Sequence, residues 1–118
     1  MTPAARGTRV LIVEDNPATA DSLWWLLSLK GFQVRVAHTG PEGVRAAQEW
    51  EPGVVLCDIS LPGLDGFGVA SALRHGEARL VAITAYGDEE TRCQAEENGF
   101  DDFLVKPVDP ARILQLLA

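Results

Sequence analysis

The chain has 118 residues, of which 47% are hydrophobic and 23% are charged, a mixture typical of one folded domain rather than a disordered chain. Its 17 acidic and 10 basic residues give a net charge of −7, which disfavours direct binding to nucleic acid, because phosphate contacts need clustered lysine and arginine. No apolar run approaches the ~20 residues of a membrane-spanning helix, and the two cysteines are too few for a disulfide framework, so we expect a cytoplasmic domain without membrane insertion.

Short apolar segments rich in Val, Ile and Leu alternate with helix-like segments along the chain. The apolar segments, which we expect to be strands, are 10–13, 32–37, 54–57, 80–83 and 103–105. The segments expected to be helices are 17–30, 41–50, 67–74, 88–98 and one that begins near Pro110. Continuously apolar strands suit a parallel sheet with helices on both faces, whereas 32–37 alternates around Gln33 and Arg35 and suggests an edge strand. The sequence therefore predicts a doubly wound α/β sandwich.

Polar side chains follow most of these strands at the point where each strand ends. Glu14 and Asp15 follow the first strand, Asp58 the third, Thr84 the fourth and Lys106 the fifth. Because the carboxyl ends of parallel strands meet at one edge of a sheet, we expect these side chains to surround a single site.

Three carboxylates at one site repel each other, since two like charges 4 Å apart cost about 4 kcal/mol at an effective dielectric constant of about 20. A hard divalent cation removes this repulsion, and carboxylate oxygens, a backbone carbonyl and waters are suitable ligands for Mg²⁺. A lysine and a hydroxyl on the far side would hold an anion. These are the groups that phosphoryl transfer to a carboxylate needs, with an aspartyl phosphate as the product.

The segments that carry these residues resemble a known family. They read VLIVEDN at 10–16, VLCDISLPGLDG at 55–66, ITA at 83–85 and FLVKP at 103–107, and together they resemble the receiver domain of two-component response regulators. The resemblance implies a (βα)5 flavodoxin-like three-layer sandwich with a parallel five-stranded sheet of order 2-1-3-4-5. We therefore expect residues 1–118 to form one receiver domain with a flexible segment at 1–7, either complete by itself or excised from a longer protein.

The resemblance also implies which residues take part in phosphoryl transfer. Asp58 would be the phosphoacceptor, Lys106 would pair with a phosphoryl oxygen, and Thr84 would hydrogen-bond the phosphoryl group once it is formed. Phe103 matches the family's aromatic switch, which turns inward as Thr84 moves. A cis peptide bond is expected between Lys106 and Pro107.

A metal site follows from the same resemblance. Asp15 and Asp58 would bind Mg²⁺ directly, the backbone carbonyl of Ser60 would be a third protein ligand, and Glu14 would act through a bound water. Mn²⁺ is the alternative ion.

The function implied is Mg²⁺-dependent transfer of a phosphoryl group to Asp58 from a histidine of a sensor kinase or of a histidine phosphotransfer protein. The output would be a switch of the face formed by the fourth helix, fifth strand and fifth helix, which is also a candidate homodimer interface. Such a phosphoacceptor assists its own phosphorylation and dephosphorylation and is not an enzyme. It would belong to a single-domain regulator, a larger response regulator or a hybrid histidine kinase.

The alternative function is that of a Mg²⁺-dependent phosphohydrolase with an aspartyl nucleophile. Enzymes of the haloacid dehalogenase group have a second acid two residues after the nucleophile, where this chain has Ser60, and a cap domain for which 118 residues leave no room. A flavodoxin-like binding module would need a phosphate loop rich in glycine and hydroxyl groups after the first strand, where this chain has Glu14, Asp15, Asn16 and Pro17. The complete set of site residues disfavours a receiver fold that is never phosphorylated.

Two histidines and a tryptophan lie outside this set of residues. His38 and His75 fall in expected loops, and we interpret both as solvated side chains rather than phosphodonors or metal ligands. If Trp24 and Leu27 face the sheet, Trp25 points outward, and an exposed tryptophan often marks an interface. Because the first helix of receiver domains docks on the kinase helix bundle, our hypothesis is that Trp25 contributes to recognition of that partner.

Overall fold

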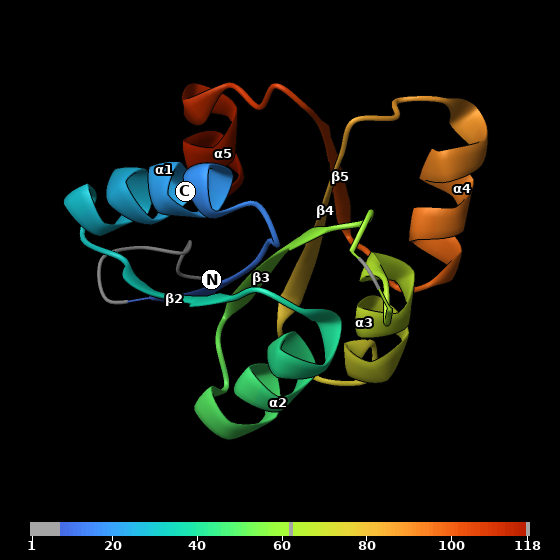
Figure 1. The fold of residues 1–118 in the computed structure, drawn as a ribbon, viewed down its shortest axis with the longest axis horizontal. Coiled ribbons are helices and arrows are strands. Elements are labelled where there is room, and N and C mark those ends of the chain that lie inside the picture. The colour runs from blue at the N-terminus through green and yellow to red at the C-terminus, as the bar shows by residue number, and fades with distance from the viewer. Residues whose placement is uncertain (1–7, 62, 118) are drawn as a thin grey trace.

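The computed structural model describes residues 8–61 and 63–117, so the segment 1–7, for which we expected flexibility, lies outside the described residues. Strands and helices alternate along the chain, as predicted (Figure 1). The strands are β1 (Arg9–Val13), β2 (Gln33–Ala37), β3 (Val54–Asp58), β4 (Arg79–Thr84) and β5 (Asp102–Val105). The helices are α1 (Pro17–Leu29), α2 (Gly40–Trp50), α3 (Gly66–Leu73), α4 (Glu89–Glu97) and α5 (Pro110–Leu117).

The five strands form one parallel sheet in the order β2-β1-β3-β4-β5. The predicted fold class and strand order are therefore confirmed. Every residue of the central strand β3 is buried, whereas Gln33 and Arg35 of β2 are exposed at the sheet edge. The alternation in segment 32–37 thus correctly indicated an edge strand.

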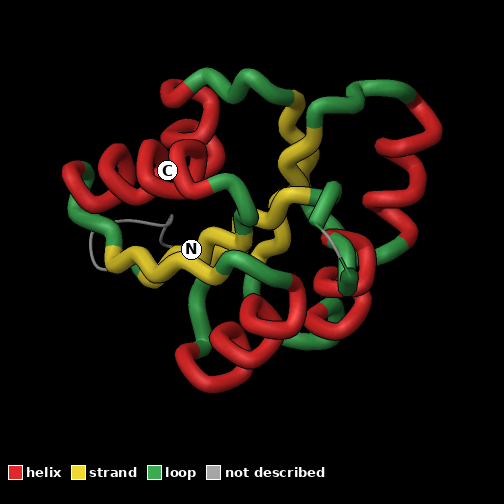
Figure 2. The backbone as a smooth tube through the Cα atoms, viewed as in Figure 1, coloured by secondary structure: helices red, strands yellow, loops and turns green. Residues whose placement is uncertain are grey.

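Helices cover both faces of the sheet, α1 and α5 on one side and α2, α3 and α4 on the other (Figures 1 and 2). Successive residues of a strand point to opposite faces. Val10 and Ile12 of β1 accordingly pack in the same cluster as Leu27 of α1 and Ile113 of α5, while Leu11 packs in the opposite cluster. Burial on both faces explains why the inner strands are continuously apolar between their first and last residues, with polar side chains only at the strand ends. Within the described ranges, no helix is both long and apolar enough to cross a membrane.

Side-chain caps fix the beginnings of the helices beside the carboxyl end of the sheet. The Asn16 side chain accepts hydrogen bonds from the N–H groups of Ala18 and Thr19, which starts α1 directly after β1. Asp65 accepts a hydrogen bond from the N–H of Gly68 at 3.0 Å. This cap starts α3 at Gly66, one residue before the predicted segment 67–74, and the helix also ends one residue earlier than predicted.

The expectation for α1 was partly wrong. Leu27 is fully buried and Trp25 is 60% exposed, as expected, but Trp24 is 41% exposed and does not face the sheet. Its ring meets the Trp25 ring edge-on, with 5.8 Å between the ring centroids. Ala20 and Leu27 provide the buried contact of α1, so the two tryptophans form an exposed aromatic pair.

Candidate functional site

The carboxyl ends of β1, β3 and β5 bring acidic groups and a lysine into direct contact. The Nζ atom of Lys106 lies 2.9 Å from Oδ2 of Asp58 and 3.0 Å from Oε1 of Glu14. Both carboxylates are buried, and the amine is partly buried. The Lys106–Pro107 peptide bond is cis, as expected.

The end of the sheet positions these residues through its last backbone hydrogen bonds. Glu14 donates its N–H to the carbonyl of Ala37 (2.9 Å), one step beyond the β1–β2 ladder. Lys106 donates its N–H to the carbonyl of Thr84 (2.7 Å), one step beyond the β4–β5 ladder. Asp58 is the last residue of β3. The side chains therefore project from a rigid sheet rather than from free loops.

The Asp58 carboxylate is hydrogen-bonded at both oxygens. Oδ1 accepts the N–H of Ser60 at 2.9 Å, and Oδ2 accepts the Lys106 amine. The start of α3 packs closely against the end of β3, because the Gly66 N–H donates to the Ile59 carbonyl at 3.0 Å. A Cβ atom at Gly66 would lie 2.6 Å from the backbone oxygen of Asp58, so only glycine permits this approach.

Thr84 and Phe103 lie on the neighbouring strands β4 and β5. Thr84 is fully buried, and its Oγ1 accepts the N–H of Tyr86 at 3.0 Å. The Phe103 ring is partly buried against the core, and the guanidinium of Arg92 lies 5.0 Å from its centroid. Thr84 is the last residue of β4, whereas Phe103 pairs with Ala82 further back along the sheet and contacts α4 through Arg92.

The acidic cluster fits a hard divalent cation. Glu14, Asp15 and Asp58 each offer one carboxylate oxygen, and these oxygens lie within 4.8 Å of one another. The second carboxylate oxygen of Glu14, Oε2, is buried and has no hydrogen-bond partner among the described residues. An unpartnered buried acceptor is costly, and an ion with its water ligands would supply the missing donor. Asp15 is exposed, so an ion can reach the cluster from solvent.

Burial and hydrogen bonding divide protons unequally between the two buried acids. Burial, together with the hydrogen bond and negative charge of Asp58, raises the pKa of Glu14 to about 7, against the opposing effect of Lys106. Burial also raises the pKa of Asp58, but hydrogen bonds from Glu14, Lys106 and the Ser60 N–H outweigh it and hold that pKa below its usual value. Asp58 is therefore the ionised acid of the pair at neutral pH, and Glu14 is the acid that becomes protonated as the pH falls below about 7.

One contact was not predicted. His38 is exposed, as expected, but its ring Nδ1 lies 3.1 Å from the backbone oxygen of Glu14. His38 directly follows β2, the neighbour of β1 in the sheet, and its position at this strand end was the signal that could have indicated the contact. His75 is exposed at the other end of the sheet, before β4.

Residues 10–118 match the sequence model of the response regulator receiver domain. The chain belongs to this family. An uncharacterised protein of Leptolyngbya boryana is 36% identical over 112 residues, which cover 92% of this chain and 86% of that protein. The DNA-binding transcriptional regulator RpaA of Synechocystis is 34% identical over 110 residues, which cover 90% of this chain and 46% of that regulator. The receiver domain thus spans less than half the length of RpaA.

Solved structures agree with this assignment. A CheY-like receiver domain protein of Methanospirillum hungatei superposes with a TM-score of 0.87 at 29% identity, covering 92% of this chain and 89% of that one. The receiver domain of a sensor histidine kinase from Pseudomonas aeruginosa superposes with a TM-score of 0.86 at 30% identity, covering 94% of both chains. That structure has a magnesium ion coordinated in its active site cleft. The chain is a receiver domain of two-component signal transduction, and these matches favour it over the phosphohydrolase alternative.

Replacing the buried acid by its amide tests the pKa of Glu14 in this receiver domain. Because that pKa is raised from 4.5 to about 7, the folded protein binds more protons than the unfolded chain in this interval, and stability falls as pH rises through it. We expect Glu14→Gln to increase the free energy of unfolding at pH 8 by about 1–3 kcal/mol, with the gain shrinking toward pH 5.

Urea denaturation in EDTA at both pH values measures the difference. Glu49→Gln, at an exposed position of α2, is the control and should change stability little at either pH. A gain that is equal at pH 5 and pH 8, or a loss at pH 8, would contradict the assignment of the buried proton to Glu14.

Proposed function

We propose that this receiver domain accepts a phosphoryl group on Asp58 from a phosphohistidine of a sensor kinase or histidine phosphotransfer protein. The observation that carries the proposal is the contact of 2.9 Å between the Asp58 carboxylate and the Lys106 amine, inside an acidic cluster that fits a divalent cation. In the transfer, a carboxylate oxygen of Asp58 forms a bond to phosphorus while the phosphorus–nitrogen bond breaks. The electron pair of that bond stays on the imidazole of the donor.

Each surrounding residue has a part in this proposal. Asp15, Asp58 and the backbone carbonyl of Ser60 would hold Mg²⁺ or Mn²⁺, with Glu14 acting through a water. When bound, the ion neutralises charge on the phosphoryl oxygens. Lys106 already contacts Asp58 and would move its hydrogen bond to a phosphoryl oxygen.

The same residues would assist removal of the phosphoryl group by water, so the domain takes part in both reactions without turning over a separate substrate. Thr84 would hydrogen-bond the new phosphoryl group and in doing so release the N–H of Tyr86, which its hydroxyl now accepts. Phe103 would then turn inward. Its partly buried ring, bounded by Arg92, supports a two-state movement that phosphorylation biases.

Labelling with a small phosphodonor tests the acceptor. On incubation with acetyl phosphate and Mg²⁺, we expect intact mass spectrometry to show one added phosphoryl group, lost in Asp58→Asn and lost when EDTA replaces Mg²⁺. Asp21→Asn, at an exposed position of α1, is the control and should be labelled like the wild type.

Labelling that persists in Asp58→Asn would refute Asp58 as the acceptor. Sustained turnover of a generic phosphate ester would instead support the phosphohydrolase alternative, because the proposed receiver takes its phosphoryl group from a phosphohistidine or from an activated donor such as acetyl phosphate.

We also propose that the exposed aromatic pair of α1 contributes to docking on the kinase or phosphotransfer protein. Trp25 is 60% exposed, and Leu29, one turn further along α1, is also exposed, so the pair offers apolar area that a partner helix can bury. Neither tryptophan belongs to the acidic cluster, so docking and chemistry can be separated by experiment.

We expect Trp25→Ala to lower the kcat/KM of phosphotransfer from the cognate kinase about 10-fold, because the truncated side chain no longer fills its place in the interface. Labelling of the same variant by acetyl phosphate should match the wild type. Unchanged transfer from the kinase would exclude Trp25 from the interface.

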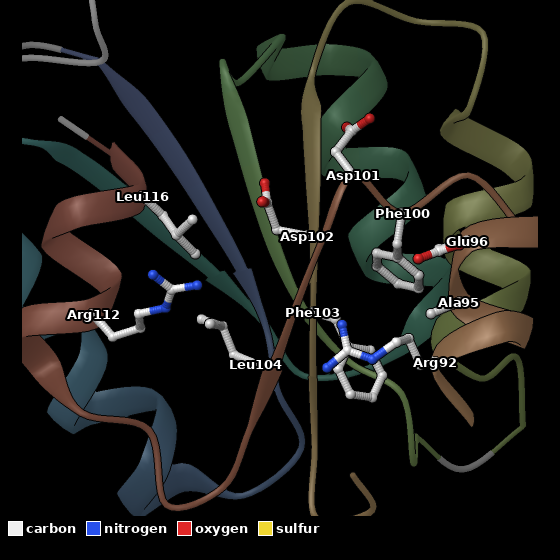
Figure 3. Close-up of a pocket in the computed structure, with 10 residues that line it drawn as sticks. All are labelled: Arg92, Ala95, Glu96, Phe100, Asp101, Asp102, Phe103, Leu104, Arg112 and Leu116. Carbon is white, nitrogen blue, oxygen red and sulfur yellow. The ribbon is translucent and has the colours of Figure 1, made fainter. Parts of the chain in front are cut away.

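The output surface in this proposal is the face formed by α4, β5 and α5, and its partner is a second copy of the domain. Figure 3 shows Arg92 and Glu96 on the α4 side of a shallow pocket of about 170 Å³ and Arg112 on its α5 side. Across the described part of the chain, neither Glu96 nor Arg112 takes part in an ion pair. A face with unpaired charges of both signs can complement itself across a two-fold axis.

Light scattering before and after phosphorylation tests the dimer. We expect the phosphorylated domain to dimerise and Arg112→Glu to weaken the dimer about 10-fold, since the reversed charge meets acidic groups across the axis. Arg45→Glu, at an exposed position of α2, should leave the dimer unchanged. A monomer in both phosphorylation states at about 100 μM would refute this interface.

We propose a cytoplasmic setting for the domain, supported by two free cysteines, Cys57 and Cys93, which cell fractionation would check. We propose that residues 1–118 act as one receiver unit, whether in a single-domain regulator, a larger regulator or a hybrid kinase.

A further inference from the structure

The peptide backbone that carries the first two acids of the site is held from the end of β2. Glu14 donates its N–H to the carbonyl of Ala37 at 2.9 Å, and its own carbonyl oxygen lies 3.1 Å from Nδ1 of His38. The consecutive residues Ala37 and His38 thus bind the N–H and the carbonyl oxygen of Glu14. The first contact is an ordinary continuation of the sheet, but the second comes from a side chain.

The geometry also assigns the tautomer of the His38 ring. A backbone carbonyl can only accept a hydrogen bond, so Nδ1 must carry the hydrogen that it donates to Glu14. This is the arrangement by which a histidine orients a neighbouring group rather than binding a metal ion through the same nitrogen.

His38 is itself fixed by the start of α2. Its backbone N–H donates to Oε2 of Glu42 at 2.9 Å, and the Glu42 N–H donates to Oγ1 of Thr39, the N-cap residue, at 3.2 Å. Together these bonds resemble a capping box in which the N–H of His38 replaces that of the N-cap residue. The cap of α2 and the backbone of the acidic site are therefore joined by one continuous series of hydrogen bonds.

The carbonyl that His38 binds belongs to the same planar peptide group as the N–H of Asp15, so holding it restrains the position of the backbone that carries the Asp15 side chain. Within ranges 8–61 and 63–117, the Asp15 side chain makes no hydrogen bond or ion pair of its own. No side-chain contact therefore compensates when the Asp15 backbone shifts.

We propose that His38 is a positioning residue of the divalent-cation site: its Nδ1–H holds the Glu14–Asp15 peptide group so that the two carboxylates face the ion. The proposal rests on the proposed function, because it concerns the same cluster. It gives the β2–α2 loop a part in a site otherwise built from β1, β3, β4 and β5.

Matched substitutions separate the hydrogen bond from the bulk of the ring. His38→Asn keeps an N–H donor near the position of Nδ1, whereas His38→Leu has a similar size and no donor. We expect isothermal titration with MgCl₂ to show affinity weakened about 10-fold in His38→Leu and changed less than about twofold in His38→Asn. His75→Leu, at an exposed loop position away from the site, should bind like the wild type.

A second readout distinguishes positioning from loss of structure. With saturating Mg²⁺, His38→Leu should be labelled by acetyl phosphate at nearly the wild-type rate, because excess ion compensates for weaker binding. Equal Mg²⁺ affinity of His38→Leu and the wild type would overturn the proposal while leaving the phosphoacceptor assignment intact. A wild-type protein that neither binds Mg²⁺ nor becomes labelled would overturn the proposed function itself.

The tautomer gives a test that needs no substitution, so the proposal stays falsifiable even if His38→Leu fails to fold. Nitrogen NMR spectroscopy of the wild type at pH 8 should show His38 protonated at Nδ1, and His75 serves as the reference for an exposed ring. Protonation of His38 at Nε2 alone would exclude the hydrogen bond and with it the proposal.

Discussion

The structure depends on one compensated charge cluster, in which a lysine amine lies between two buried carboxylates. Lys106 contacts Asp58 at 2.9 Å and Glu14 at 3.0 Å, and burial would otherwise make these acids too costly to keep charged. A single cation faces two acids, so the compensation is incomplete: burial and the neighbouring Asp58 raise the pKa of Glu14, whereas hydrogen bonds hold the pKa of Asp58 below its usual value. A divalent cation that binds the cluster completes it. The same charge imbalance that destabilises the metal-free protein would therefore favour the binding of a metal ion.

The sheet is the element that makes this cluster precise. Each charged residue lies at the end of a strand or one step beyond it, and the last ladder hydrogen bonds hold its backbone. Helices on both faces bury the strands, so their apolar side chains fix the position of the strands against each other. On the far side, the exposed start of α1 and the loops leave Asp15 open to solvent. The architecture thus combines a rigid sheet with a solvent-accessible edge. This suits a carboxylate that has to contact a phosphoryl donor and whose phosphorylated form a partner protein then recognises.

Much of this arrangement could be predicted from the sequence, because its signals are local. Apolar runs define the strands, and the residues after them define the rim, so the convergence of Glu14, Asp58 and Lys106 follows once the strands are parallel. The strand order is not local and came from the resemblance of the motifs to receiver domains. The orientation of Trp24 could not be predicted, because α1 lies over the edge strand β2 and its neighbour β1, where the sheet covers only a narrow stripe of the helix. The contact of His38 depends on a ring orientation and a tautomer that no sequence pattern encodes.

The positions of the three charged residues along the chain have a consequence for folding during synthesis. Glu14 and Asp58 belong to the first half of the chain, but the cation that balances them comes from residue 106, just after the edge strand β5. A nascent chain that has released only the first four strands has paired acids without their amine. The charge cluster is therefore complete only when β5 has joined the sheet and has brought Lys106 beside the two acids.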